Sequence, residues 1–306
     1  MDKRDEIVLY TKDTIVATTS RGNQEKWLDS DKNIWYKLDH HGFESLAETV
    51  ASQILIHHSN AFELGIPVTE YFIKKVVVHG NTRIVCGSEN FRAPENSIVT
   101  AHTLLKNGLG KNFTEQFNAK KNLIQRITLL VDTVQDITRL SDFGQYLTLL
   151  FEIDALILNQ DRHLNNIAVM RTSSGYTYCP IFDNGAAFLL DYGMYPYDVE
   201  TKSWISQARA LPFKTTFSTL LRTCRQLYGA QLRVHFSKQD IRDILNPLLQ
   251  YYPEPFHVAA GLFCRKMDGR FCRKKPDTDV RRAGRIDVAG VFCRTREGRG
   301  QSRSLH

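Results

Sequence analysis

The residues best suited to chemistry lie in two polar segments, "NQDRHLNN" at 159–166 and "FDNG" at 182–185, each of which follows an apolar run. Asp161 and Asn166 have the D-x-x-x-x-N spacing that phosphoryl-transfer catalysts use in a catalytic loop. There the Asp accepts the proton of the attacking hydroxyl and the Asn binds Mg²⁺. The alternative is an ordinary polar turn, because loops rich in Asp and Asn are common.

Asp183 supplies a second carboxylate at the end of an apolar, strand-like run, and Gly185 follows it. Mg²⁺ prefers hard oxygen ligands and takes few of them from protein, so a carboxylate in this position suits the metal. The competing interpretation is a strand that ends in a D-N-G hairpin turn.

Lys37 lies in "NIWYKLD", a run that is otherwise typical of a strand. A lysine on such a strand, ahead of a helix with glutamates, suggests an ammonium that contacts phosphate and is held by an ion pair. Glu48 is the preferred partner and Glu44 the second choice. The alternative is a strand lysine that faces solvent, which is the commoner situation.

The segment "SRGNQEKW" at 20–27 precedes this strand and contains one glycine, Gly22. Successive backbone N–H groups in such a loop can bind phosphate. The segment lacks the three glycines of a typical nucleotide loop, and it is not a Walker loop because no "GKS" or "GKT" is present.

The elements that must position these residues change in character along the chain. Before residue 91 we expect strands and one helix, at 43–60, where apolar residues recur at helical spacing. The strands are expected at 6–10, 13–19, 33–39, 68–80 and 81–91. After residue 91 the pattern is mostly helical, with helices expected at 113–135, 141–159, 215–230 and 238–251. We expect Ser141 or Asp142 to cap the second of these and Ser237 the last.

The order of the motifs is that of the bilobal kinase fold: loop, strand lysine, helix glutamate, Asp-x4-Asn and Asp-x-Gly. Over roughly residues 15–250 the chain resembles the HipA-like Ser/Thr kinases, most specifically through "NQDRHLNN" and "FDNG". The segments "SRGNQEKW", "GFESLAETVASQIL" and "CGSENF" also resemble that family. Two motifs depart from ordinary eukaryotic kinases: Asp-Arg-His replaces His-Arg-Asp, and Asp-Asn-Gly replaces Asp-Phe-Gly.

The resemblance implies an α+β, bilobal protein-kinase-like fold. A small β-rich N-lobe with one helix would span 1–90, and a larger, mostly helical C-lobe would span 91–256. The resemblance also implies roles for single residues. Asp161 would be the catalytic base with His163 orienting its loop, and Asn166 and Asp183 would bind Mg²⁺. The residues expected to bind ATP are Gly22, Gln24, Lys37, Glu48, Cys86, Ser88 and Glu89.

The expected function is an ATP- and Mg²⁺-dependent Ser/Thr protein kinase, with autophosphorylation at Thr18, Thr19 or Ser20 beside the nucleotide loop. One alternative is a phosphoinositide or small-molecule kinase of the same fold. The segment 186–203 speaks against it, because this segment is net acidic and an anionic head group calls for a basic one. A second alternative is a nucleotide-binding pseudokinase that acts as a scaffold or effector.

The charge of the chain is concentrated at its C-terminal end. Residues 257–306 hold 13 Lys and Arg against 5 Asp and Glu, a net charge of +8, which leaves residues 1–256 at −1. The body is therefore not expected to bind nucleic acid, whereas the tail, expected to be disordered, could bind it or another anionic surface.

The sequence also bears on the compartment. No apolar run is long enough to span a membrane, and the charged start is unlike a signal peptide. Six cysteines without CxxC spacing suggest free thiols. We expect a cytoplasmic protein, or an effector secreted without a cleavable signal.

Overall fold

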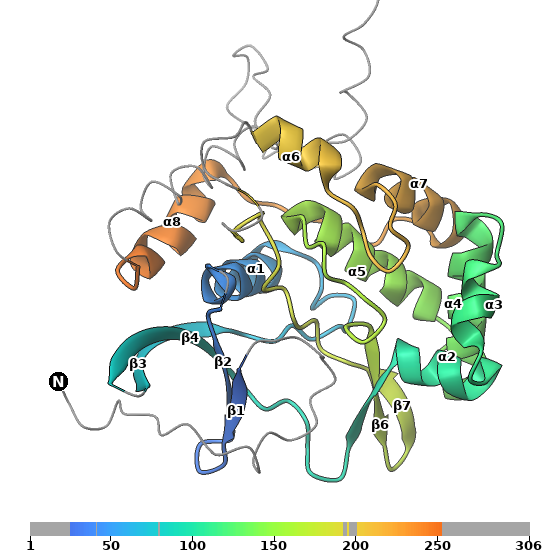
Figure 1. The fold of residues 1–306 in the computed structure, drawn as a ribbon, viewed down its shortest axis with the longest axis horizontal. Coiled ribbons are helices and arrows are strands. Elements are labelled where there is room, and N and C mark those ends of the chain that lie inside the picture. Colours follow the sequence, from blue (N-terminus) through green and yellow to red (C-terminus); the bar gives the residue numbers. More distant parts are fainter. Residues whose placement is uncertain (1–24, 41, 79, 192–194, 196–200, 253–306) are drawn as a thin grey trace, which may run out of the picture.

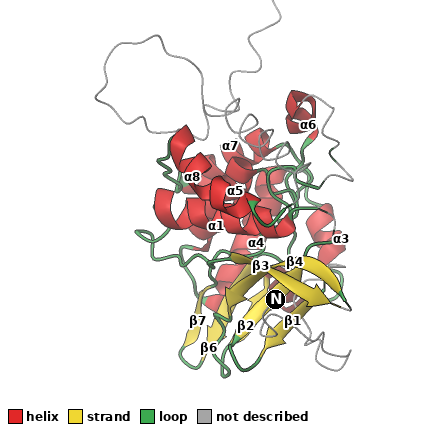
Figure 2. Ribbon diagram, turned by 90° about the vertical axis from the view of Figure 1, so that its left-hand side faces the viewer, coloured by secondary structure: helices red, strands yellow, loops and turns green. Residues whose placement is uncertain are grey.

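The computed structural model describes residues 25–252 with the exception of 41, 79, 192–194 and 196–200. A small antiparallel sheet with one helix is followed by a larger, mostly helical part (Figures 1 and 2), so the α+β prediction is confirmed. The expected strands at 6–10 and 13–19 and the basic segment 257–306 lie outside the described residues.

The first sheet has four antiparallel strands in the order β1-β2-β4-β3. Its strands are β1 (Lys26–Asp29), β2 (Ile34–Leu38), β3 (Phe72–Val78) and β4 (Asn81–Glu89). Helix α1 (Glu44–His58) contacts β3 and β4 on one face of the sheet. A separate apolar cluster, made of Trp27, Tyr36, Leu38, Val76 and Val85, lies within the sheet itself.

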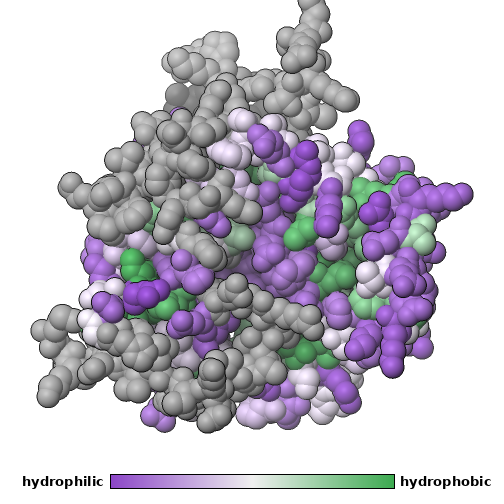
Figure 3. Space-filling model, viewed as in Figure 1, coloured by the Kyte–Doolittle hydropathy of each residue, from purple (hydrophilic) through white to green (hydrophobic). Residues whose placement is uncertain are grey.

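A second sheet, in the order β5-β6-β7, lies at the edge of the helical part. It consists of β5 (Ser97–Thr100), β6 (Ala168–Thr172) and β7 (Gly175–Tyr178). The helices are α2 (Ala101–Leu109), α3 (Phe113–Asn118), α4 (Leu123–Thr138), α5 (Phe143–Ile157), α6 (Thr201–Gln207), α7 (Phe217–Tyr228) and α8 (Lys238–Leu249). The main apolar core joins α1 to α5 and to the helices around it. Figure 3 shows many hydrophilic side chains on the right-hand part of one face, over α2 to α4.

Several expectations about single elements were wrong. The helix expected at 113–135 is two helices, because the side chain of Asn122 accepts a hydrogen bond from the backbone N–H of Gln125 and starts a new helix there. For α5 the expected N-cap position is correct, since Asp142 occupies it, but its side chain makes no capping hydrogen bond. Strand β1 begins at Lys26, within the segment expected to be a connector. Instead of a strand before Asp183, the chain makes one isolated bridge between Val68 and Ile181.

Other expectations were confirmed. Helices α7 and α8 match the two predicted near the C-terminal end of the body. Ser237 accepts a hydrogen bond from Asp240 N–H, and the Asp240 side chain accepts one from Ser237 N–H, which completes a capping box. Helix α5 ends at Ile157, directly before the polar segment 159–166, so that segment begins where a buried helix stops.

Candidate active site

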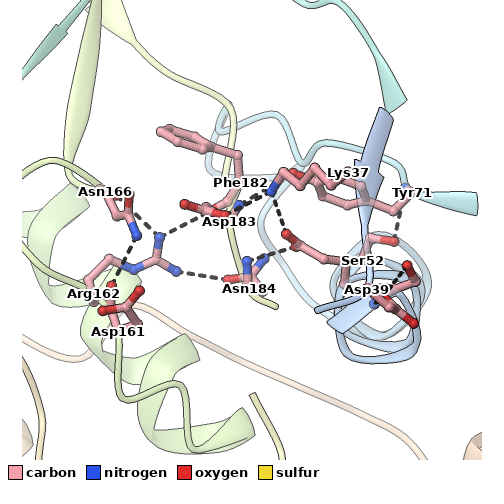
Figure 4. A network of polar contacts seen from close by, with 12 residues as sticks. Lys37, Asp39, Ser52, Tyr71, Asp161, Arg162, Asn166, Phe182, Asp183 and Asn184 are labelled. Carbon is pink, nitrogen blue, oxygen red and sulfur yellow. Dashed lines mark hydrogen bonds and ion pairs between the residues drawn. The ribbon is translucent and has the colours of Figure 1, made fainter. Parts of the chain in front are cut away.

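Lys37 forms ion pairs with two carboxylates, one on α1 and one in the loop of Asp183 (Figure 4). Its Nζ lies 2.6 Å from Glu48 Oε1 of α1 and 2.8 Å from Asp183 Oδ1. The predicted ion pair with Glu48 is therefore present, and Lys37 does not face solvent freely, since its side chain is 12% exposed. The ammonium also lies 5.2 Å from the centre of the Tyr71 ring.

The charges of this group reinforce one another. Burial by itself would lower the pKa of Lys37, but the carboxylates of Asp183 and Glu48 raise it well above its usual value. Burial would raise the pKa of Asp183, but the ammonium groups of Lys37 and Lys26 hold it below its usual value. Both groups are therefore ionised at neutral pH.

Lys26 is a second lysine of this site, and the sequence did not single it out. It is paired directly with Lys37 across β1 and β2, so both side chains leave the same face of the sheet. Burial lowers the pKa of Lys26 and nearby Lys37 lowers it further, while Asp183 opposes this shift. The two ammonium groups repel each other, and an anion bound beside them would relieve that repulsion.

The loop that follows α5 presents Asp161. Leu158 ends the helix in the left-handed conformation, with φ 57°, and Asn159 Oδ1 then accepts a hydrogen bond from Asp161 N–H at 3.2 Å. The Asp161 side chain is 56% exposed and its Oδ2 lies 3.9 Å from His163 Nε2. His163 Nδ1 accepts a hydrogen bond from Asn165 N–H, and this contact orients the ring so that Nε2 faces Asp161.

The electrostatics of Asp161 suit a proton acceptor. Burial of part of the group raises the pKa of Asp161 above its usual value, His163 opposes this, and the negative charge of Asp183 raises it further. A carboxylate whose pKa is moved toward neutrality is a better general base than an unperturbed one.

Arg162, in the left-hand part of the network in Figure 4, is 1% exposed. It forms a bidentate ion pair with Asp154 of α5, with Nε and Nη2 2.9–3.1 Å from the carboxylate oxygens. Its Nη1 donates to the carbonyls of Asn166 and Phe182, and its Nη2 donates to Asn184 Oδ1. One buried guanidinium therefore fixes the loop of Asp161 relative to the loop of Asp183.

Asn166 has the arrangement expected of a metal ligand. Its Nδ2 donates to the carbonyl of Asp161 at 3.0 Å. This bond turns Oδ1 the other way, where it is buried and has no hydrogen-bond partner among the described residues. A buried acceptor without a donor is costly unless another group binds it, and an amide oxygen is a suitable ligand for Mg²⁺. Asn166 therefore fits the predicted metal, with Asp183 as the carboxylate.

The Asp183 loop is held from both sides by Asn184. The backbone N–H of Asn184 donates to Glu48 Oε2 at 2.7 Å, and its side chain accepts from Arg162 at 2.8 Å. The backbone here is strained, because Asp183, Phe188 and Leu189 have φ values of 61°, 62° and 57°. Non-glycine residues in this region cost about 1–3 kcal/mol each and cluster at functional sites.

The remaining predicted ATP-binding residues divide into two groups. Cys86 and Ser88 are buried on β4, where Cys86 pairs with Lys37, and Glu89 is exposed at the end of the strand. Gly22 and Gln24 lie outside the described residues, as do the expected autophosphorylation sites Thr18, Thr19 and Ser20. Cys86, Cys179 and Cys224 are buried free thiols, and burial raises the pKa of each.

The sequence interpretation missed Arg162, Asp154 and Asn184 as parts of the site. Asp154 gave a signal, because a carboxylate within the apolar helix "LTLLFEIDALIL" must be paired when buried. Its partner, eight residues further on, lies in the polar segment that was already identified. Asn184 gave no such signal, since its position between two motif residues reads equally well as part of a turn.

No protein-family model matches this sequence, and no curated protein sequence matches it significantly. Among solved structures, the fold is similar to that of the proinflammatory kinase CtkA of Helicobacter pylori. The TM-score is 0.54 at 15% identity, with 81% of this chain and 87% of that chain covered. The match shows that the chain has the kinase fold that its resemblance to the HipA-like kinases predicted.

A second similar structure is HipA of Shewanella oneidensis, from a complex with HipB and operator DNA. It matches at 14% identity over 80% of this chain and 62% of that chain, and its TM-score of 0.40 is too low to establish a shared fold. No helix among the described residues has the length and apolar character needed to cross a bilayer.

Proposed function

We propose that this chain is an ATP- and Mg²⁺-dependent Ser/Thr protein kinase of the HipA-like type. The observation that carries the proposal is the single network that joins Lys37, Glu48 and Asp183 to Asp161 and Asn166 through Arg162 and Asn184. The fold shared with a bacterial kinase is consistent with it.

The roles follow from charge and position. Lys37 and Lys26 hold the phosphates of ATP, and Glu48 keeps the Lys37 ammonium in place. The acceptor hydroxyl oxygen attacks the γ-phosphorus while the bond from that phosphorus to the β,γ-bridging oxygen breaks. The hydroxyl proton passes to Asp161, and ADP leaves with the electron pair on its terminal oxygen.

Asn166 and Asp183 would hold Mg²⁺, which when bound neutralises charge on the phosphates. Among the described residues, no group of three or more His, Cys, Asp or Glu side chains could hold a metal ion. A metal at this position would therefore take its other ligands from phosphate and water, as Mg²⁺ commonly does.

The test is transfer of radiolabelled phosphate from ATP to the protein itself and to a generic acceptor. We expect Asp161→Asn and Asp183→Asn to lose at least about 100-fold in rate. Asp136→Asn, at an exposed position of α4, should behave like the wild type. Equal labelling in all four proteins would contradict the mechanism.

Two other outcomes of the same assay separate the alternatives. Nucleotide binding without transfer to any acceptor would indicate a pseudokinase scaffold. Transfer to a lipid head group or small molecule, with no labelled protein, would indicate the small-molecule kinase. For autophosphorylation, the prediction is a phosphate on the peptide 14–26 after incubation with Mg-ATP, detected by mass spectrometry. Its absence would contradict that part.

A further inference from the structure

Helix α1, which carries Glu48, begins without a cap of its own. Phe43 occupies the N-cap position and makes no side-chain hydrogen bond. Instead, Asp39 Oδ1 accepts from Ser45 N–H at 2.7 Å and from Ser45 Oγ at 2.5 Å. A carboxylate at this end of a helix satisfies a free N–H group and complements the positive end of the helix dipole.

Asp39 belongs to the same strand segment as Lys37. Its backbone N–H donates to the carbonyl of Ile84 on β4 at 3.0 Å, so the residue continues the sheet just past the end of β2. Ser45 in turn lies three residues before Glu48 on α1. The bonds between Asp39 and Ser45 therefore set the separation of the two elements that bring Lys37 and Glu48 together.

The second oxygen of Asp39 is bound by Tyr252, from the far end of the described chain. The Tyr252 hydroxyl donates to Asp39 Oδ2 at 3.1 Å, and its ring lies 5.1 Å from the ring of Phe43. Tyr252 is 6% exposed. Burial and the Asp39 carboxylate both raise the pKa of Tyr252, so its hydroxyl stays protonated and remains a donor.

The other end of α1 is held independently. Ser59 forms an isolated bridge with Val234, and the Asn60 side chain accepts from Arg233 N–H and donates to the carbonyl of Gln231. That segment is fixed to α5, because Glu152 Oε2 accepts from Gln231 N–H and Leu232 N–H. The C-terminal end of α1 is anchored in this way, and the bonds from Ser45 to Asp39 hold its N-terminal end.

We propose that Tyr252 is a positioning residue for phosphoryl transfer, which acts through Asp39 and Ser45 to hold α1 where Glu48 pairs with Lys37. The proposal rests on the proposed function for its catalytic consequence. The tether itself stands on the contacts above, so the two parts can fail separately.

Asp39 gives this tether a pH signature. Burial raises the pKa of Asp39 to about 7, Glu44 raises it as well, and the hydrogen bonds from Ser45 and Tyr252 oppose this. Among the described residues, Arg83, whose Nη2 donates to the Asp39 carbonyl, and the neutral thiol of Cys86 also face Asp39. A protonated carboxyl is a weaker acceptor than a carboxylate, so the three bonds are strongest when Asp39 is ionised.

The experiment compares Tyr252→Phe with Tyr251→Phe in the full-length chain. Tyr251 is the neighbouring tyrosine, half-buried, and its hydroxyl has no hydrogen bond to the described residues. At pH 7 we expect kcat of Tyr252→Phe to fall roughly tenfold, the size expected for a hydrogen bond to a charged group. The pH at which activity rises should move upward, because a bond that lowers the pKa of Asp39 is gone.

Two further variants make the pH result specific. Asp39→Asn should remove the response, so that adding Tyr252→Phe to it leaves the pH profile unchanged. Ser45→Ala removes one of the two bonds from Ser45 and should give a smaller loss of activity than Tyr252→Phe. If Tyr252→Phe folds poorly, Ser45→Ala tests the same tether. A pH profile of Tyr252→Phe identical to that of the wild type would overturn the proposal.

Hydrogen exchange tests the tether without reference to catalysis. Backbone amides of residues 44–49 should exchange at least several-fold faster in Tyr252→Phe than in the wild type or in Tyr251→Phe. Unchanged exchange there, or a uniform increase over the whole chain, would contradict a positioning role. If the wild type transfers no phosphate, the proposed function fails while this measurement still decides whether Tyr252 holds α1.

Discussion

Arg162 and Lys37 are both cations paired with buried carboxylates, but their surroundings differ. Arg162 and its partner Asp154 have side chains 1% and 2% exposed, and the other donors of Arg162 bind three further oxygens of the two loops. The side chains of Lys37 and Asp183 are 12% and 17% exposed, and a second lysine, Lys26, lies beside them.

From this difference we expect the Arg162 pair to be structural and the Lys37 pair to be functional. The Arg162 group is saturated, so it can fix two loops but has nothing to offer a ligand. The side chains of Lys37 and Asp183 are partly exposed, and Lys26 adds a second positive charge beside them. The proposed contact with phosphate requires both features. The comparison predicts that changes to Arg162 act first on stability and changes to Lys37 act first on activity.

The largest effect is expected for Arg162→Met. It leaves Asp154 buried without its ion-pair partner, and we expect the free energy of unfolding to fall by about 3–5 kcal/mol. Urea denaturation measures this, with Arg222→Met at an exposed position of α7 as the control. The double variant Asp154→Leu/Arg162→Met should recover part of the loss, because no buried charge remains. An unchanged stability in Arg162→Met would show that the pair is not structural.

Lys37→Met should lower the rate of phosphate transfer by about 100- to 1000-fold, the cost of losing one well-placed donor to a developing charge. It leaves the buried Glu48 with the Asn184 N–H as a remaining donor, so we also expect a loss of stability, smaller than that of Arg162→Met. Lys106→Met, at an exposed lysine of α2, serves as the control. If Lys37→Met loses stability as Arg162→Met does and keeps its activity, the distinction between the two pairs is wrong.

The same variant changes the dependence of stability on pH. Because the pKa of Asp183 is lowered in the folded state, its contribution is present above its ordinary pKa of 3.8 and is lost as the pH falls below that value. In Lys37→Met this acid-side loss should become smaller. Urea denaturation of both proteins at a series of pH values from about 5 down to about 2 measures it.

A smaller effect is expected for Lys26→Met. If Lys26 contacts phosphate, KM for ATP should rise roughly tenfold while kcat changes less, since a hydrogen bond to a charged group is lost on binding. Steady-state kinetics at several ATP concentrations measure the two constants. An unchanged KM would confine the phosphate contact to Lys37.

The smallest effect is expected for Gly185→Ala. Gly185 does not have a positive φ, and a Cβ there would meet Glu44 and Glu48 at ordinary distances of 3.5–3.7 Å. The free energy of unfolding should therefore remain within about 0.5 kcal/mol of the wild-type value. The rate of phosphate transfer should stay close to that of the wild type. A large loss would show that the loop depends on glycine rather than on the contacts of Asp183 and Asn184.

The sequence by itself determined which residues could take part and in what order. Lys37, Glu48, Asp161, Asn166 and Asp183 stand in motifs whose residue types match a chemistry. The change from strand patterns before residue 91 to helix patterns after it agrees with the fold class that the family resemblance implied. Such motifs can be read because side-chain chemistry and chain order do not depend on packing. Their catalytic and metal-binding roles stay predictions until the variants above are measured.

Only the tertiary structure decided which residues hold these groups in place. Arg162 pairs with Asp154, which lies eight residues before it. In contrast, Asn184 bonds to Glu48 from 136 residues away, and Tyr252 bonds to Asp39 from 213 residues away. Lys26 joins the site through the register of β1 with β2. Contacts of this kind arise from the packing of whole elements, which local residue patterns do not record.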